Sequence, residues 1–215
     1  MPRPLALPLG PDAVRDLQVG DEVLLRGRIV TGRAPAHRWL AAAERPEVRA
    51  LAEGSLVYHC APVVARQPGG GWRLLAAGPS ASMRMEEWQA AVIARYGLRA
   101  VLGKGGMGPR TLEALQARGA VYLHAAGGLA VGLARCVVRV HAVHQLEELG
   151  AAEALWAVEV VDFPAIVTMD AHGRSLHQLA SGDAGLLVQQ LMGPAPGSAP
   201  EPSASPPARG RAASR

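Results

Sequence analysis

Cysteines, lysines and aromatic residues are scarce in this sequence. Cys60 and Cys136 are the only two cysteines among 215 residues, too few for a disulfide framework or a metal cage built from cysteines. Four Trp, three Tyr and one Phe offer few rings for stacking bases, and the formal net charge is only +4. These absences exclude a disulfide-stabilised scaffold and argue against nucleic-acid binding.

Targeting and membrane-spanning segments are also missing from the pattern. The first ten residues contain one Arg and are interrupted by Pro4 and Pro8, unlike a signal peptide. The uncharged stretch 119–134 is interrupted by glycines and is shorter than the roughly 20 apolar residues of a spanning helix. We therefore expect a soluble, cytoplasmic protein that does not bind membranes.

The composition divides the chain into a folded unit and a tail. With 49% hydrophobic residues, the sequence can build a core, and we expect one domain over residues 1–190. Residues 193–215 are rich in Pro, Ala, Ser and Arg and contain no large apolar residue. Because such a segment cannot bury enough surface to offset its ordering entropy, a disordered tail is predicted there.

Strand-like and helix-like segments alternate along the folded unit. Residues 22–30 alternate apolar and charged side chains, as a half-buried strand does, whereas the apolar spacing from Met85 to Tyr96 predicts an amphipathic helix ending at Gly97. Further strands are predicted at 56–65, 72–77, 99–102, 121–123, 155–161 and 165–169, and helices at 35–51 and 109–117. This interleaving predicts a mixed α/β domain.

Lys104 is the most informative single residue. The 22 basic residues are 21 arginines and this one lysine, which lies in Gly103-Lys104-Gly105-Gly106. Lysine presents a compact ammonium where arginine would present a long planar fork, and glycines allow close approach of a ligand. The segment therefore favours a tight anion site, the alternative being a lysine that stands on a turn by chance.

The same segment also fits a rival motif. Gly103, Gly105 and Gly108 form G-x-G-x-x-G between a predicted strand and a predicted helix, the context of a dinucleotide fingerprint. The acidic residue expected about 20 positions later is missing, because no acid lies between Glu113 and Glu147. A dinucleotide-binding module stays open as an alternative on this weak signal.

Arg33, Arg84 and Lys104 stand on predicted loops at the ends of elements, with a hydroxyl at Ser80 and an imidazole at His37. Three converging cations would suit a small dicarboxylate, because Arg pairs bidentately with carboxylate. The residues alone do not separate this reading from three unrelated surface charges.

Several uncommon motifs in one order resemble the β subunit, or C-terminal domain, of class I iron–sulfur fumarases and L(+)-tartrate dehydratases. The resemblance covers about residues 5–180. Its carriers are Val19-Gly20-Asp21-Glu22-Val23, Thr31-Gly32-Arg33 with His37, Gly78-Pro79-Ser80 with Arg84-Met85, Gly103-Lys104-Gly105-Gly106, Tyr122-Leu123 before Gly127-Gly128, and Glu153-Ala154-Leu155-Trp156 before Asp162-Phe163-Pro164-Ala165.

The resemblance implies a swivelling β/β/α domain and a division of labour between two subunits. In that family three cysteines of the α part hold the [4Fe-4S] cluster, so a chain like this one would ligate no metal itself. It would need a cluster-bearing α subunit in a hetero-oligomer.

Carried over position by position, the resemblance makes Arg33, Arg84 and Lys104 the residues that bind substrate carboxylates, with His37 helping to line the site. Ser80 stands where the family typically has a Thr thought to act as the base, and is expected to be catalytic. The sequence departs from the family pattern at Ala34, which replaces Asp, at Ser80 and Ala81, which replace Thr-Thr, and at Cys60-Ala61-Pro62, which replaces C-G-P.

The function implied by the resemblance is that of a hydro-lyase β subunit, adding or removing water on a small dicarboxylate, with fumarate or malate as first candidate and L(+)-tartrate as second. Ala34 and Ala81 leave open a non-catalytic, dicarboxylate-binding paralogue.

Overall fold

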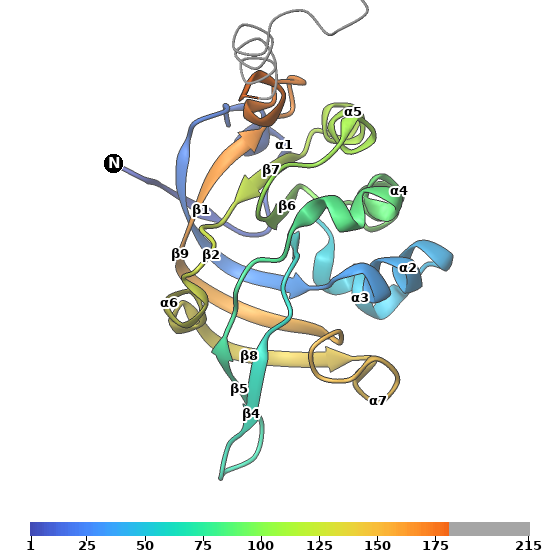
Figure 1. Ribbon diagram of the computed structural model, residues 1–215, viewed down its shortest axis with the longest axis vertical. Helices are drawn as coiled ribbons and strands as arrows, with labels where there is room; N and C mark the ends of the chain where they lie inside the picture. Colours follow the sequence, from blue (N-terminus) through green and yellow to red (C-terminus); the bar gives the residue numbers. More distant parts are fainter. Residues whose placement is uncertain (181–215) are drawn as a thin grey trace, which may run out of the picture. The chain divides into compact units, whose positions relative to one another are not determined.

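A computed structural model describes residues 1–180 (Figure 1). The predicted tail at 193–215 and the last ten residues of the predicted 1–190 domain lie outside the described residues. No helix within residues 1–180 is long and apolar enough to cross a membrane.

Strand β2 (Glu22–Thr31) organises the sheet because it pairs along both of its edges. On one edge its first half pairs with β1 (Arg3–Ala6) and its end pairs with β3 (Leu56–Tyr58), both in parallel orientation. On the other edge it runs antiparallel to the 15-residue β9 (Leu155–Met169). One strand thus joins the parallel and antiparallel parts of the fold.

The strand pairings form a closed ring. Parallel strands β6 (Ala100–Gly103) and β7 (Val121–His124) follow β3, and β9 pairs antiparallel with both β7 and β2. Strands β2, β3, β6, β7 and β9 therefore form a closed ring, a small barrel, with β8 (Val137–His144) added on β9. A separate hairpin of β4 (Val63–Arg66) and β5 (Trp72–Ala76) extends away from it (Figure 1).

Strands β3 and β6 are buried on both faces, whereas β2 and β9 each carry some exposed side chains. Alternate residues of the strands serve two apolar clusters. In β3, Leu56 and Tyr58 join one cluster with Leu102 and Trp156, while Val57 between them joins the other. The second cluster takes residues from helices, such as Val92, as well as from strands. This alternation is the period of two that a strand imposes on its side chains.

Four helices lie to one side of the strands in Figure 1: α2 (Ala34–Ala42), α3 (Pro46–Ala52), α4 (Glu86–Tyr96) and α5 (Pro109–Arg118). The shorter helices are α1 (Pro11–Arg15), α6 (Ala130–Arg135), α7 (Leu146–Leu149) and the 3₁₀ turn η1 (Ser82–Met85). Helices alternate with a sheet of mixed orientation, which confirms the predicted α/β class.

Most predicted elements are confirmed, including the helix that ends at Gly97, which takes a left-handed φ of 61°. Two predictions were wrong at prolines. The helix expected over 35–51 divides before Pro46, and the strand expected over 56–65 divides before Val63, next to Pro62. Proline lacks the donor that both ladders need and restricts the residue before it.

The C-terminal part of the sheet also differs from expectation. The two segments predicted on either side of Asp162-Phe163-Pro164 are one continuous strand, β9, which passes through Asp162 at a φ of 52°. Strands β1 and β8 and helices α1, α6 and α7 were not predicted. They are short or, in β8, lack the regular burial alternation of a half-buried strand.

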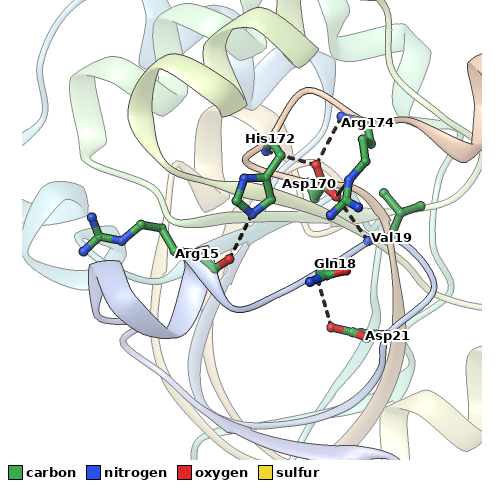
Figure 2. Close-up of polar contacts among 7 residues, drawn as sticks. All are labelled: Arg15, Gln18, Val19, Asp21, Asp170, His172 and Arg174. Atoms are coloured by element: carbon green, nitrogen blue, oxygen red, sulfur yellow. Dashed lines mark hydrogen bonds and ion pairs between the residues drawn. The ribbon is translucent and has the colours of Figure 1, made fainter.

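Asp170 fastens the end of β9 to the turn before β2 (Figure 2). The buried carboxylate accepts from the backbone N–H groups of His172 at 3.0 Å and Arg174 at 3.1 Å, and from Arg174 Nε at 2.7 Å. Its Oδ2 also accepts from Val19 N–H at 3.3 Å. This anchor gives the Val19-Gly20-Asp21 motif a structural role.

Candidate functional site

The candidate site residues lie where the parallel strands end. Strands β2, β3 and β6 are parallel, so the residues that follow them, Arg33, His59 and Lys104, come to the same edge of the barrel. In open α/β sheets, ligands bind outside the carboxyl ends of the strands, which makes this edge of the barrel the candidate site.

A loop of residues 78–84 runs across this edge and pairs with it at two isolated β-bridges, Pro79 with Cys60 and Ala81 with Lys104. The Ser80 N–H donates to His59 O at 2.7 Å, and the Lys104 N–H donates to Ser80 O at 3.2 Å. The Ser82 N–H then donates to Lys104 O at 3.0 Å. These backbone bonds pair Ala81 with Lys104 and bring Ser80 to the neighbouring position of the loop, although Ser80 and Lys104 are 24 positions apart.

Lys104 is exposed and forms no ion pair within residues 1–180. Its side chain extends beside Gly127, where an added Cβ would lie 3.7 Å from Lys104 Cδ and 4.0 Å from Nζ. The neighbouring glycines have different roles: Gly105 takes a φ of 71°, and a Cβ on Gly106 would lie 2.5 Å from the His177 ring. Gly106 is thus required by packing, and the ammonium is available to an anion.

Arg33 carries the second predicted cation and is partly buried. Its Nη1 lies 3.1 Å from Glu153 Oε1, and the two side chains are 28% and 25% exposed. The carboxylate holds the guanidinium in one orientation at the end of β2. Glu153 was part of the family resemblance, but its ion pair with Arg33 was not predicted.

Arg84 lies in η1 and is exposed, without an ion pair among the described residues. Its backbone N–H donates to Ala81 O at 3.4 Å, so it belongs to the same loop as Ser80. The loop thus carries both a hydroxyl and a free cation, next to Lys104.

His37 lies behind the site instead of on its surface. It is completely buried in α2, with Nδ1 2.9 Å from Arg33 O and Nε2 3.0 Å from Gln89 Oε1. Burial lowers the pKa of His37 to about 4, so the ring is neutral at pH 7. In this structure, His37 supports the Arg33 backbone and has no open face to a ligand.

A second buried imidazole, His59, connects α4 to the loop. Its Nε2 lies 2.8 Å from Gln89 Oε1, and its Nδ1 lies 2.8 Å from Ser82 Oγ, which also accepts from Tyr122 OH at 2.7 Å. The sequence alone predicted no functional role for His59, Ser82 or Gln89. Only the barrel register brings these residues together, and no local motif signals it.

The rival dinucleotide reading fails at the start of α5. A bound pyrophosphate would need the free N–H groups of that helix. These groups are taken by the Glu86 carboxylate, which accepts from Gly108 N at 2.8 Å, Thr111 N at 3.1 Å and Thr111 Oγ1 at 2.6 Å. A Cβ on Gly108 would lie 2.6 Å from the same carboxylate. Gly108 thus makes room for a side chain of the protein itself.

The described residues do not fit an iron–sulfur cluster. Such clusters need several cysteine thiolates, and burial raises the pKa of Cys60 to about 12. Burial also raises the pKa of Cys136, which caps the C-terminal end of α6. Within residues 1–180, no group of three His, Cys, Asp or Glu side chains could hold a metal ion.

The fold and its edge define a small α/β barrel domain that presents, on adjoining loops, an oriented arginine, a hydroxyl and two cations without ion pairs among residues 1–180. The chain belongs to the fumarase C-terminus family, whose model matches residues 6–180.

Two named groups of relatives agree with this assignment. The chain is 44% identical over 174 residues to a putative fumarate hydratase class I of Geobacillus stearothermophilus, covering 81% of this chain but 33% of that protein. It is 38% identical over 177 residues to the L(+)-tartrate dehydratase subunit beta of Escherichia coli, covering 82% and 87%, and 38% identical over 168 residues to a putative subunit beta of Methanocaldococcus jannaschii, covering 77% and 86%. The chain therefore spans about a third of the first relative and most of the beta subunits.

Proposed function

We propose that this chain is the β subunit of a heteromeric hydro-lyase that adds or removes water on a small dicarboxylate. The observation that carries the proposal is the backbone ladder between residues 80–82 and Lys104, which brings the loop that carries Ser80 beside an exposed lysine without an ion pair among the described residues. The relatives named above, a fumarate hydratase and tartrate dehydratase beta subunits, support this reaction class.

Each side chain has a distinct role in this proposal. Lys104 and Arg84 bind the carboxylates, while Arg33 contributes a third cation whose charge is partly balanced by Glu153. Ser80 transfers the proton, as a hydroxyl held at hydrogen-bonding distance from substrate can. His37 supports Arg33 through its carbonyl instead of touching substrate.

The site is one half of an active site. Lys104 and Arg84 are exposed and no second wall faces them within the described chain, so a partner subunit would enclose the substrate. Because this chain lacks the thiolates, the [4Fe-4S] cluster belongs to that α subunit. The residues of this chain would bind and orient the dicarboxylate and hold the proton at Ser80.

Fumarate or malate is the first candidate substrate and L(+)-tartrate the second. The higher identity is to the fumarate hydratase, whereas the subunit-length match is to the tartrate dehydratase beta subunits. A dicarboxylate-binding paralogue without catalysis is the alternative to both.

The test is anaerobic purification of the chain from its native cell together with whatever co-purifies, followed by assays of fumarate hydration and of malate and tartrate dehydration. Turnover of one of these compounds by a two-subunit complex is expected. Saturable dicarboxylate binding without turnover by an iron-loaded complex would establish the non-catalytic alternative, and neither binding nor turnover would refute the proposal.

A further inference from the structure

The buried polar cluster behind the loop contains a hydrogen-bonding conflict that fixes its donors and acceptors. His37 Nδ1 lies 2.9 Å from Arg33 O, and a carbonyl oxygen can only accept. Nδ1 must therefore carry the hydrogen. Because the buried ring is neutral, its Nε2 has no hydrogen and must accept.

The group that faces His37 Nε2 must then be a donor. Gln89 Oε1 lies 3.0 Å away, which would set two acceptors against each other, while Gln89 Nε2 is buried without a partner among the described residues. Turning the amide by 180° resolves the conflict. The NH₂ group then faces both imidazoles, and the unpaired atom becomes a carbonyl oxygen, which proteins leave unpaired more readily than N–H.

The same amide sets the state of His59. Its Nε2, 2.8 Å from the Gln89 amide, accepts the second hydrogen, so a neutral His59 carries its own hydrogen on Nδ1. Burial lowers the pKa of His59, which keeps the ring neutral. Nδ1 then donates to Ser82 Oγ at 2.8 Å. The hydrogen bonds thus run outward from the Gln89 amide, through His37 to Arg33 O and through His59 to Ser82 Oγ.

On the His59 side, these hydrogen bonds end at the loop that carries Ser80 and Arg84. Ser82 Oγ lies so close to Gly103 that an added Cβ there would be 2.0 Å from it, and 3.1 Å from both His59 Nδ1 and Tyr122 OH. The hydroxyl is therefore seated over the glycine that precedes Lys104. The Ser82 N–H donates to Lys104 O, so both the side chain and the backbone of Ser82 hold the loop against residues 103 and 104.

We propose that His59, in the Nδ1–H tautomer set by Gln89, is a positioning residue that holds the loop of residues 78–84 against Gly103 and Lys104 by donating a hydrogen bond to Ser82. The contacts that hold the loop in this position all come from this chain. Its consequence for catalysis rests on the function proposed above.

Two replacements of His59 distinguish the role of Nδ1 from the role of Nε2. The amide nitrogen of asparagine stands at the position of Nδ1, whereas the amide of glutamine reaches the position of Nε2. His59→Asn therefore keeps a donor for Ser82, and His59→Gln removes it while keeping a polar group near Gln89. Ser82→Ala removes the acceptor instead.

The tautomer is read by ¹⁵N–¹H correlation spectra of the imidazoles in the full-length chain at pH 7. Both His37 and His59 are expected as neutral Nδ1–H tautomers. Hydrogen exchange of the Ser82 and Lys104 amides measures the loop, and His59→Gln and Ser82→Ala should each raise these rates about tenfold, the loss of one ordinary hydrogen bond. His59→Asn should stay near the wild-type rate.

These readouts need no partner and no turnover. An Nε2–H tautomer at His59, or exchange rates equal in His59→Asn and His59→Gln, would overturn the proposal. In the two-subunit complex, His59→Gln should lower kcat with little change in KM, His59→Asn should restore it, and the His59→Gln/Ser82→Ala double variant should lose no more than either single variant. If no complex hydrates a dicarboxylate while the tautomer and exchange results hold, the proposed function fails and the positioning role stands.

Discussion

Lys104 carries the sharpest prediction at the scale of single residues. If its ammonium binds a substrate carboxylate beside Gly127, then Lys104→Arg keeps the charge but replaces a compact head with a longer planar one. We expect Lys104→Arg to lose nearly as much kcat/KM as Lys104→Ala. A hydrogen bond to a charged group contributes about 1.5–3 kcal/mol, a loss of about 10- to 150-fold.

The measurement is steady-state kinetics of the two-subunit complex over a range of dicarboxylate concentrations. Arg110→Ala, which removes an exposed cation from the start of α5, is the matched control and should keep full activity. A Lys104→Arg variant that behaves as wild type would make Lys104 an ordinary surface cation.

Ser80 is predicted to act in proton transfer, not in folding. Its N–H and C=O hold the loop through the backbone, so Ser80→Ala leaves the ladder with His59 and Lys104 intact. We expect kcat to fall by about 10²- to 10⁴-fold, the usual effect of losing a general acid or base, with an unchanged melting temperature. Ser80→Thr should be tolerated, and full turnover by Ser80→Ala would assign proton transfer to the partner subunit.

His37 predicts a pH dependence of stability. Its pKa is about 4 in the folded chain and near 6.5 when unfolded, so above pH 6.5 neither state is protonated and the residue adds no slope. Below pH 6.5 the unfolded chain binds the proton first, and stability falls as the pH drops toward 4, by about 3 kcal/mol in total.

Urea denaturation of wild type and His37→Asn between pH 4 and 7.5 isolates this contribution, because the carboxylates titrate in both proteins. The wild-type curve should fall more steeply with decreasing pH. Parallel curves would show that the pKa of His37 in the folded chain stays near its ordinary value, which would contradict the effect of burial assigned to it.

At the scale of elements, Glu86 links α4 to α5. It lies in the first turn of α4, and its carboxylate caps the start of α5. Its carboxylate satisfies two N–H groups and a hydroxyl, so Glu86→Ala leaves them without a partner at a positive helix end. A loss of about 1–2 kcal/mol in the free energy of unfolding is expected. Glu87→Ala, one residue further on and exposed, is the control and should stay within about 0.5 kcal/mol of wild type.

The elements were largely predictable because their signals are local. Gly97 ends α4 in a left-handed conformation, which a glycine at the end of an amphipathic stretch predicts. Pro109 is the first residue of α5, a position that proline favours. Pro46 and Pro62 carried the same kind of information, but the apolar residues around them suggested longer elements. The placement of cations and glycines at the ends of strands could also be predicted, because it depends on neighbouring residues in the sequence.

The polar cluster was not predictable, because its members meet only through the register of the barrel. His59, Ser82 and Tyr122 are separated by 23 and 40 positions, and β3, β6 and β7 must pair in that order before the side chains meet. A histidine inside a strand reads as core from the sequence alone. Its role depends on the atoms that surround it.

At the scale of the whole molecule, the described chain has a complete core and an incomplete site. The described residues bury two apolar clusters, whereas Met83, Arg84 and Lys104 at the candidate site are exposed. A structure that needs a partner for its site but not for its core should fold alone and act only in a complex.

The last prediction follows from this separation. The isolated chain should unfold cooperatively, contain no iron or acid-labile sulfide after anaerobic reconstitution, and show no dehydratase activity. The reason is chemical: Cys60 is buried with a raised pKa, and two thiols cannot replace the thiolates that a cluster requires. Iron and sulfide analysis, absorption near 400 nm and thermal unfolding decide the three points on one preparation. A brown, active protein from this chain alone would place the cluster here and remove the need for an α subunit, whereas a chain that unfolds without cooperativity would mean that the partner completes the core as well as the site.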